Sequence, residues 1–267
     1  MSAAFRLKAD LDDPRVDLLW QAGCTGVMQS GDEVVAFFPE QVSLTVAGRW
    51  EEVDQVDYVA AYLAGLEPVV LGRLTVAPLH YEVAEEAGRI VLRLDPGMAF
   101  GTGHHESTRL ALGALERADL RGQRVLDVGT GSGILAIAAG LLGAAEVTGI
   151  DSDATTSEIA QKNAELNEVR AVFATSSIEA WREGEYDVIV ANLYGAIHTR
   201  LAPIYGGLLA DGGRLYATGI LEGELDHVRR KLSRHLDVYA CAREGDWALL
   251  SARRLSPVPS RPGRAGP

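Results

Sequence analysis

The sequence has few cysteines and no long apolar run. Two cysteines, Cys24 and Cys241, are too few for a disulfide framework, and the chain opens with MSAAFRLKAD rather than with an apolar leader. The longest run of small apolar residues, 135–145, contains glycines and falls well short of the roughly 20 residues that cross a bilayer. We therefore expect a cytoplasmic protein without a membrane partner.

Basic residues are also scarce. The chain has 25 lysines and arginines against 37 aspartates and glutamates, which gives a formal net charge of -12. Binding to a nucleic acid backbone needs clustered cations, so we expect no direct nucleic acid contact and favour a basic protein partner. The first 60 residues hold 11 acidic and four basic side chains. This acidic excess fits a lysine-rich partner, and it fits equally well a solvated face that only aids solubility.

The 267 residues suffice for one large domain and a small appendage. Residues 1–52 show a strand, helix, strand, strand order, which predicts a small α+β ferredoxin-like domain. Residues 53–67 have helical spacing up to Pro68 and are expected to form a helical linker. Residues 68–255 form the predicted main domain. Residues 256–267 contain four of the ten prolines and predict a disordered tail.

The main domain shows a regular alternation of apolar runs and helical stretches. Runs at 124–128, 146–150, 172–175 and 188–191 are typical of parallel strands that are buried on both faces. Three further runs follow at 214–218, 236–240 and 247–252, and no helical stretch separates the last pair. The pattern predicts an α/β fold with a doubly wound, mostly parallel sheet and an antiparallel last strand.

A glycine-rich turn joins the first of these runs to a helix. Residues 126–133 are LDVGTGSG, with glycines at 129, 131 and 133. Such glycines allow a sharp turn and the close approach of a ligand to bare backbone. Asp151 ends the next predicted strand, where a carboxylate accepts hydrogen bonds from a ribose diol. The pair predicts a nucleotide-type ligand.

Two other site types fit these residues less well. The dinucleotide fingerprint G-x-G-x-x-G would place its third glycine at position 134, which is Ile134. A nicotinamide oxidoreductase therefore remains only as an alternative. His104 and His105 are adjacent and lack a spaced third ligand, so no metal site is predicted.

Asn192 follows the apolar run 188–191, and the carboxyl ends of strands are where α/β sheets bind ligands. The sequence Asn192-Leu193-Tyr194 resembles a motif of N-methyltransferases, although it lacks the prolines of the DNA-amine versions. That difference argues against a nucleobase substrate.

Together, the segment 94–108 (LDPGMAFGTGHHEST), the glycine turn, Asp151 and Asn192-Leu193-Tyr194 strongly resemble the PrmA family of Rossmann-like, S-adenosylmethionine-dependent methyltransferases. The resemblance implies methylation of the N-terminal α-amine and lysine ε-amines of ribosomal protein L11, the basic protein at the base of the large-subunit stalk. A methyltransferase that acts on another amine is the alternative. The resemblance also assigns substrate recognition to residues 1–52 and catalysis to residues 68–255.

The resemblance further implies which residues form the site. Asn192 is the expected catalytic residue, and the enzyme is expected to act as a monomer. The expected cofactor contacts are Thr108, Gly129, Gly131, Asp151 and Asn192, together with Phe100, Gly101 and Thr102 in a loop that would fold over the cofactor.

Overall fold

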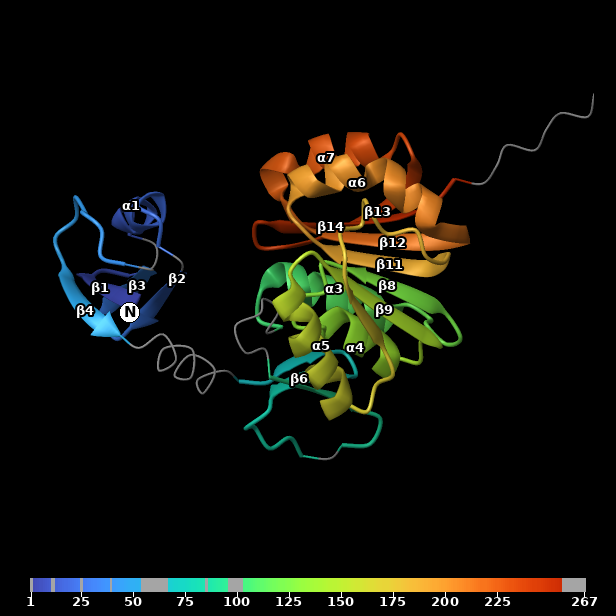
Figure 1. The fold of residues 1–267 in the computed structure, drawn as a ribbon, viewed down its shortest axis with the longest axis horizontal. Helices are drawn as coiled ribbons and strands as arrows, with labels where there is room; N and C mark the ends of the chain where they lie inside the picture. Colours follow the sequence, from blue (N-terminus) through green and yellow to red (C-terminus); the bar gives the residue numbers. More distant parts are fainter. Residues whose placement is uncertain are drawn as a thin grey trace, which may run out of the picture. The chain divides into compact units, whose positions relative to one another are not determined.

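The computed structural model describes residues 2–10, 13–24, 26–38, 40–53, 67–84, 86–95 and 103–255. The chain divides into two compact units, Met1–Leu66 and Glu67–Pro267 (Figure 1). The predicted linker lies almost wholly outside the described residues, as do the predicted tail and the loop that contains Phe100, Gly101 and Thr102. The helical linker and the disordered tail therefore stay predictions.

The N-terminal unit is an antiparallel sheet with a helix. Its elements are β1 (Ser2–Lys8), α1 (Arg15–Gln21), β2 (Gly26–Ser30), β3 (Glu33–Phe38) and β4 (Arg49–Val53). The strand order β2-β3-β1-β4 is the order of a ferredoxin-like sheet. The rings of Phe5 and Phe38 each meet Trp50 edge-on at 5.1 Å, which closes a small core.

This unit departs from a complete ferredoxin-like domain between β3 and β4. Residues 40–48 contain no helix, where that fold has its second one. The reason lies in the sequence: Val42, Leu44 and Val46 alternate with period two and pack against the same core. An extended segment buries all three side chains on one side, which a helical turn would not do.

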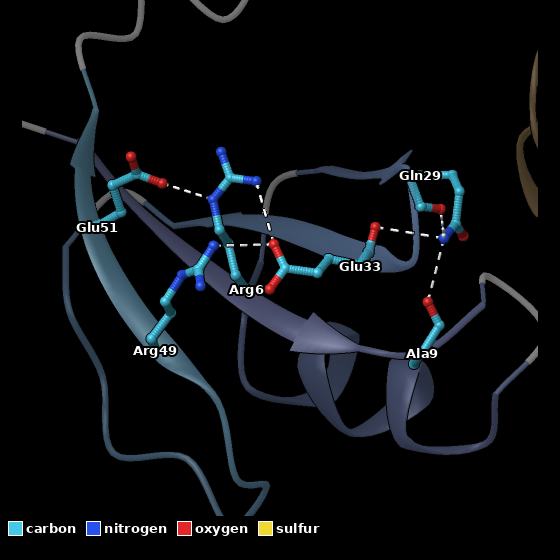
Figure 2. Close-up of polar contacts among 7 residues, drawn as sticks. Arg6, Ala9, Gln29, Glu33, Arg49 and Glu51 are labelled. Atoms are coloured by element: carbon cyan, nitrogen blue, oxygen red, sulfur yellow. Dashed lines mark hydrogen bonds and ion pairs between the residues drawn. The ribbon is translucent and has the colours of Figure 1, made fainter.

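Ion pairs link three strands of the N-terminal sheet (Figure 2). Glu33 accepts from Arg49 at 3.0 Å and faces Arg6 at 3.5 Å, and Arg6 also pairs with Glu51. Two cations and two anions therefore neutralise each other across β1, β3 and β4. Half-exposed pairs of this kind contribute about 0–1 kcal/mol each to stability, so they set strand register more than they hold the unit together.

The second unit contains two sheets. The smaller has the order β5-β6-β7, with β5 (Val69–Leu71) antiparallel to β6 (Leu74–Pro78) and β6 parallel to β7 (Ile90–Leu94). The larger has the order β10-β9-β8-β11-β12-β14-β13. Its strands are β8 (Arg124–Val128), β9 (Glu146–Asp151), β10 (Val172–Thr175), β11 (Tyr186–Asn192), β12 (Leu209–Leu221), β13 (Leu236–Glu244) and β14 (Trp247–Arg254).

The larger sheet confirms the predicted doubly wound fold. Strand β14 runs antiparallel to both β12 and β13, and the other neighbouring strands are parallel. The strand order reverses at the centre, where β8 lies between β9 and β11. Ligands of such sheets bind outside the carboxyl ends of the strands at this switch point.

Helices cover both faces of the larger sheet (Figure 1). Helices α3 (Glu106–Arg117), α4 (Ile134–Leu141) and α5 (Ala154–Leu166) lie on one face, and α6 (Gly195–Leu208) and α7 (Leu225–Leu232) on the other. Along β11, Val188 and Val190 pack in the core beneath α3, α4 and α5, whereas Ile189 and Ala191 pack in the core beneath α6 and α7. This explains why the strand is apolar throughout. No described helix is long and apolar enough to cross a membrane.

A buried histidine connects α6 to β12. The Nε2 atom of His198 lies 2.8 Å from the Thr218 carbonyl oxygen, and Nδ1 lies 3.1 Å from the Tyr205 hydroxyl. A carbonyl oxygen can only accept, so Nε2 carries the proton and Nδ1 accepts from Tyr205. Burial lowers the pKa of His198 to about 4, so the ring is neutral at physiological pH.

This neutral ring predicts a loss of stability in acid. The folded-state pKa of His198 lies below its ordinary value of 6.5, so its contribution to stability is complete above pH 6.5 and is lost as the pH falls toward 4. We expect His198→Gln to be less stable than the wild type at pH 7.5 by about 1–3 kcal/mol. This difference in unfolding free energy between variant and wild type should decrease by up to about 1.4 kcal/mol per pH unit below 6.5. Urea unfolding at pH 7.5, 6 and 5 measures it.

The matched control is His227→Gln, which changes an exposed histidine on α7. Because the side chain is exposed, this substitution should change the unfolding free energy by no more than about 0.5 kcal/mol. A gap for His198→Gln that does not change with pH would contradict the assignment of a neutral ring.

Candidate active site

A cavity of about 670 Å³ opens at the carboxyl ends of β8, β9 and β11. Gly129, Gly131, Asp151 and Asn192 all contribute to its lining. The lining also contains apolar side chains, which include Ile178, Ile197 and Leu201. The fold thus brings together four of the residues that the sequence indicated, from three strands far apart in the chain.

The glycine turn follows β8 directly. Gly129, Gly131 and Gly133 have φ of +73°, +52° and +83°, in the left-handed region that favours glycine. A Cβ atom on Gly129 would lie 2.6 Å from Leu193 Cδ2, and one on Gly133 would lie 3.0 Å from the Cβ of Ala160. The turn therefore needs glycine both for its backbone angles and for its close packing.

Asp151 at the end of β9 is held by two backbone amides. Its Oδ2 accepts from Gly131 N at 3.0 Å, and its Oδ1 accepts from Asp153 N at 3.1 Å. An ionised carboxylate has about four lone-pair positions. Both oxygens therefore keep the capacity to accept from a ligand in the cavity while the carboxylate plane stays fixed.

Asp127 lies beneath the turn and is fully buried. Its Oδ2 accepts from Thr130 Oγ1 at 2.8 Å and from Ala136 N at 3.1 Å, while Oδ1 has no hydrogen-bond partner among the described residues. Burial raises the pKa of this carboxyl to about 7. Asp127 thus fastens the turn to the start of α4, a role that the sequence did not reveal.

Thr108 on α3 contacts Asn192 rather than the open cavity. Asn192 Nδ2 donates to Thr108 Oγ1 at 3.2 Å, and Thr108 is only 1% exposed. The hydrogen bond orients the Asn192 side chain. Because the amide nitrogen is engaged, Oδ1 is the atom with which Asn192 can accept from a donor in the cavity.

Gly219 is a further site residue that sequence reasoning missed. It lies at an irregularity of β12, with φ of +81°. A Cβ atom there would lie 2.8 Å from Asn192 Oδ1 and 2.6 Å from the Leu193 carbonyl oxygen. The only signal in the sequence is a glycine inside an apolar strand, which often marks a bulge or a close approach.

The two adjacent histidines have structural partners. His104 Nε2 lies 2.9 Å from the Glu67 carbonyl oxygen. His105 caps α3 through Ser107 and meets the Trp247 ring edge-on at 4.7 Å. In the described parts of the chain, no group of three potential ligands could hold a metal ion.

Comparison with known proteins gives a family match over most of the chain. The family described as Ribosomal protein L11 methyltransferase (PrmA) matches residues 14–255. Proteins named Ribosomal protein L11 methyltransferase from Deinococcus radiodurans and Thermus thermophilus are 42% and 43% identical to this chain. These alignments cover 92% and 94% of this chain and 96% and 99% of the relatives.

A solved structure agrees with these relatives. The ribosomal protein L11 methylase from Lactobacillus delbrueckii subsp. bulgaricus is similar with a TM-score of 0.67 and 33% sequence identity. The similarity covers 71% of this chain and all of that one.

The contacts around Gly219 predict the effect of adding one methyl group. We expect Gly219→Ala to lower the unfolding free energy by about 1–3 kcal/mol, because alanine is strained at this φ and its Cβ would displace Asn192. Chemical denaturation measures the stability, and the resonances of the Asn192 side-chain amide report its displacement. Gly223→Ala is the control, since a Cβ there would meet nothing within 4 Å. Unchanged Asn192 resonances in Gly219→Ala would contradict the close approach.

Proposed function

The chain belongs to the ribosomal protein L11 methyltransferase (PrmA) family, and on this premise we propose that it transfers methyl groups from S-adenosylmethionine to amines of ribosomal protein L11. We further propose that the acceptors are the N-terminal α-amine and lysine ε-amines. The family match over residues 14–255 is the observation that carries this proposal, because it includes parts of both units.

The cavity residues fit such a cofactor. An amino acid joined to a nucleoside needs acceptors for a ribose diol, apolar contact for a base and room for a bent chain. Asp151 offers the acceptors, Ile178 and Leu201 offer apolar contact, and Gly129 and Gly131 leave room beside the backbone. The bound cofactor would supply an electrophilic methyl group on a sulfonium. What this chain supplies is placement of the amine.

The amine must be neutral when it attacks. For a lysine with the ordinary pKa of about 10.4, the neutral form at pH 7 costs about 4.6 kcal/mol, against about 1.4 kcal/mol for an α-amine with a pKa near 8. The N-terminal amine is therefore the easier acceptor. A lysine ε-amine needs more help from its surroundings.

Asn192 is the residue we assign to the amine. Its amide nitrogen donates to Thr108. Its Oδ1 would accept an N–H bond from the substrate amine and so direct the lone pair of that amine toward the methyl group. An amide oxygen carries no full negative charge, so it does not favour the unreactive ammonium form as a carboxylate would.

The rival oxidoreductase function is not favoured. Ile134 occupies the place of the third fingerprint glycine and packs into the core of the larger unit at 3% exposed. Methylation of a different amine-bearing protein is the other alternative. In the experiment below it corresponds to cofactor binding without methylation of L11.

The charge balance supports a basic protein substrate. All four basic side chains in the first 60 residues have acidic partners, namely Arg6, Lys8, Arg15 and Arg49. The acidic excess of this segment is therefore not offset by free cations. We propose that the N-terminal unit uses it to recognise the substrate, and that the enzyme acts as a cytoplasmic monomer without direct nucleic acid contact.

The deciding experiment is intact-mass analysis of ribosomal protein L11 after incubation with the enzyme and S-adenosylmethionine. Successive methyl increments on L11, mapped to its N-terminus and lysines by fragmentation, are the expected result. Cofactor binding without any methyl increment would overturn the assignment of L11 as the substrate. Absence of both cofactor binding and methyl increments would overturn the proposed methyltransferase activity.

The role of Asn192 predicts a selective kinetic defect. We expect Asn192→Ala to lower the single-turnover rate about 100-fold or more, because the amine is no longer directed at the methyl group. The Kd for S-adenosylmethionine should change far less. Asn192→Asp should also be slow, since its charge favours ammonium. Thr199→Ala is the control that should keep full activity, because this half-exposed residue of α6 does not line the cavity and its hydroxyl donates to the Ala196 carbonyl oxygen. A loss of cofactor affinity with an intact single-turnover rate would refute the role.

A further inference from the structure

Helix α5 presents a stripe of small and amide side chains to the back of the glycine turn. Ala160 and Asn163 are spaced by three residues, so they lie on one face of the helix, and Asn167 is its C-cap. Ala160 and Asn163 are fully buried. Ala160 meets the turn at Gly133, where even an added Cβ atom would come within 3.0 Å. The helix is thus in direct contact with the turn at this point.

Asn163 joins two segments that are far apart in the sequence. Its Nδ2 donates to the Ser132 carbonyl oxygen at 2.9 Å, inside the glycine turn. Its Oδ1 accepts from Asp95 N at 2.9 Å, just after β7. Asp95 is also the residue from which the chain enters the segment 96–102.

Asn167 makes a similar contact with β7, and its Nδ2 also donates to the Asn163 carbonyl oxygen at 2.7 Å. Its Oδ1 accepts from Arg93 N at 2.8 Å, and its Nδ2 donates to Arg93 O at 2.6 Å. Asn167 therefore continues the edge of the small sheet without touching the turn. It provides a natural comparison for Asn163, because the two residues share a residue type and a neighbouring strand, and Asn167 is the C-cap of the helix that carries Asn163.

Three consecutive residues of the turn are each held by a different element. Thr130 is bound by Asp127 of β8, Gly131 by Asp151 of β9, and Ser132 by Asn163 of α5. A turn with three glycines has a wide range of backbone conformations, so its shape depends on such tertiary contacts. Asn163 differs from Asp151 in one respect: it is not among the described residues that line the cavity.

We propose that Asn163 is a positioning residue for the cofactor, which acts by fixing the Ser132 peptide of the glycine turn from behind. This inference rests on the proposed function, because the cofactor is S-adenosylmethionine. When the Ser132 carbonyl is released, the turn loses one of its anchors and the amide of Gly131 loses its fixed direction beside Asp151. The binding site then has to be ordered by the cofactor itself, at a cost in affinity.

Calorimetric titration of the full-length enzyme with S-adenosylmethionine tests the proposal. We expect Asn163→Ala to raise the Kd at least about tenfold. Asn163→Asp should do the same, because its carboxylate still accepts from Asp95 N but cannot donate to the Ser132 carbonyl. In turnover assays with L11, the KM for the cofactor should rise in parallel with the Kd, and kcat at saturating cofactor should stay within about threefold of the wild type.

Two controls separate positioning from general destabilisation. Asn167→Ala removes the contacts to β7 and the hydrogen bond to the Asn163 carbonyl oxygen. It leaves the contact between the Asn163 side chain and Ser132, so its Kd should stay within about twofold of the wild type. Val147→Ala shortens a buried side chain at the far end of β9 and should lower the melting temperature without affecting the Kd. The aspartate in Asn163→Asp has the same size and shape as asparagine. This variant can therefore be measured if Asn163→Ala does not fold.

The outcomes distinguish this inference from the proposed function. A wild-type Kd for Asn163→Asp, or an equal loss of affinity in Asn167→Ala and Val147→Ala, would overturn the positioning role and leave the methyltransferase standing. A wild-type enzyme that binds no S-adenosylmethionine would overturn both. Higher Kd values in the two Asn163 variants alone would support the proposal.

Discussion

The conformation of the glycine turn after β8 is the constraint on which the site depends. Three positive φ angles let the chain leave the strand and start α4 within a few residues. A turn with three glycines can adopt many backbone conformations, so contacts with the surrounding residues must hold it in one of them. Asp127, Asp151 and Asn163 do this from two strands and a helix, and each holds a different residue of the turn. The doubly wound sheet serves function by bringing these three side chains to one place.

Buried polar groups hold the other wall of the site in the same way. His198 binds the Thr218 carbonyl oxygen, which also accepts from Leu193 N at 3.0 Å, directly after Asn192. The Thr218 hydroxyl in turn donates to a carbonyl oxygen in α3 or β14, each at 3.2 Å. Because each of these groups has a partner, their burial stabilises a single arrangement around Asn192. Asp127 differs from them, because its Oδ1 has no hydrogen-bond partner among the described residues and burial raises its pKa to about 7.

The two units differ in how far their structure follows from local pattern. In the larger unit, apolar runs flanked by helical stretches predicted every strand of the larger sheet, and the reversed β14 followed from the missing helix before it. In the N-terminal unit, the pattern predicted the strand, helix, strand, strand order but not the extended segment that follows it. Val42, Leu44 and Val46 form an extended segment whose alternation is easily missed, because glycine, serine and threonine between them weaken the contrast.

The sequence alone determined the fold class, the glycine turn and the carboxylate at the end of β9, because these depend on residue type and on spacing over at most about two dozen positions. It also indicated Asn192, since a polar residue at the end of an apolar run lies at the ligand-binding edge. Only the tertiary structure decided what holds these residues. The contacts of Asn192 with Thr108, Asn163 with Asp95, and Gly219 with Leu193 join segments 26 to 84 residues apart. Such contacts arise where strands and helices pack, and no periodicity along the chain encodes which side chains will meet there.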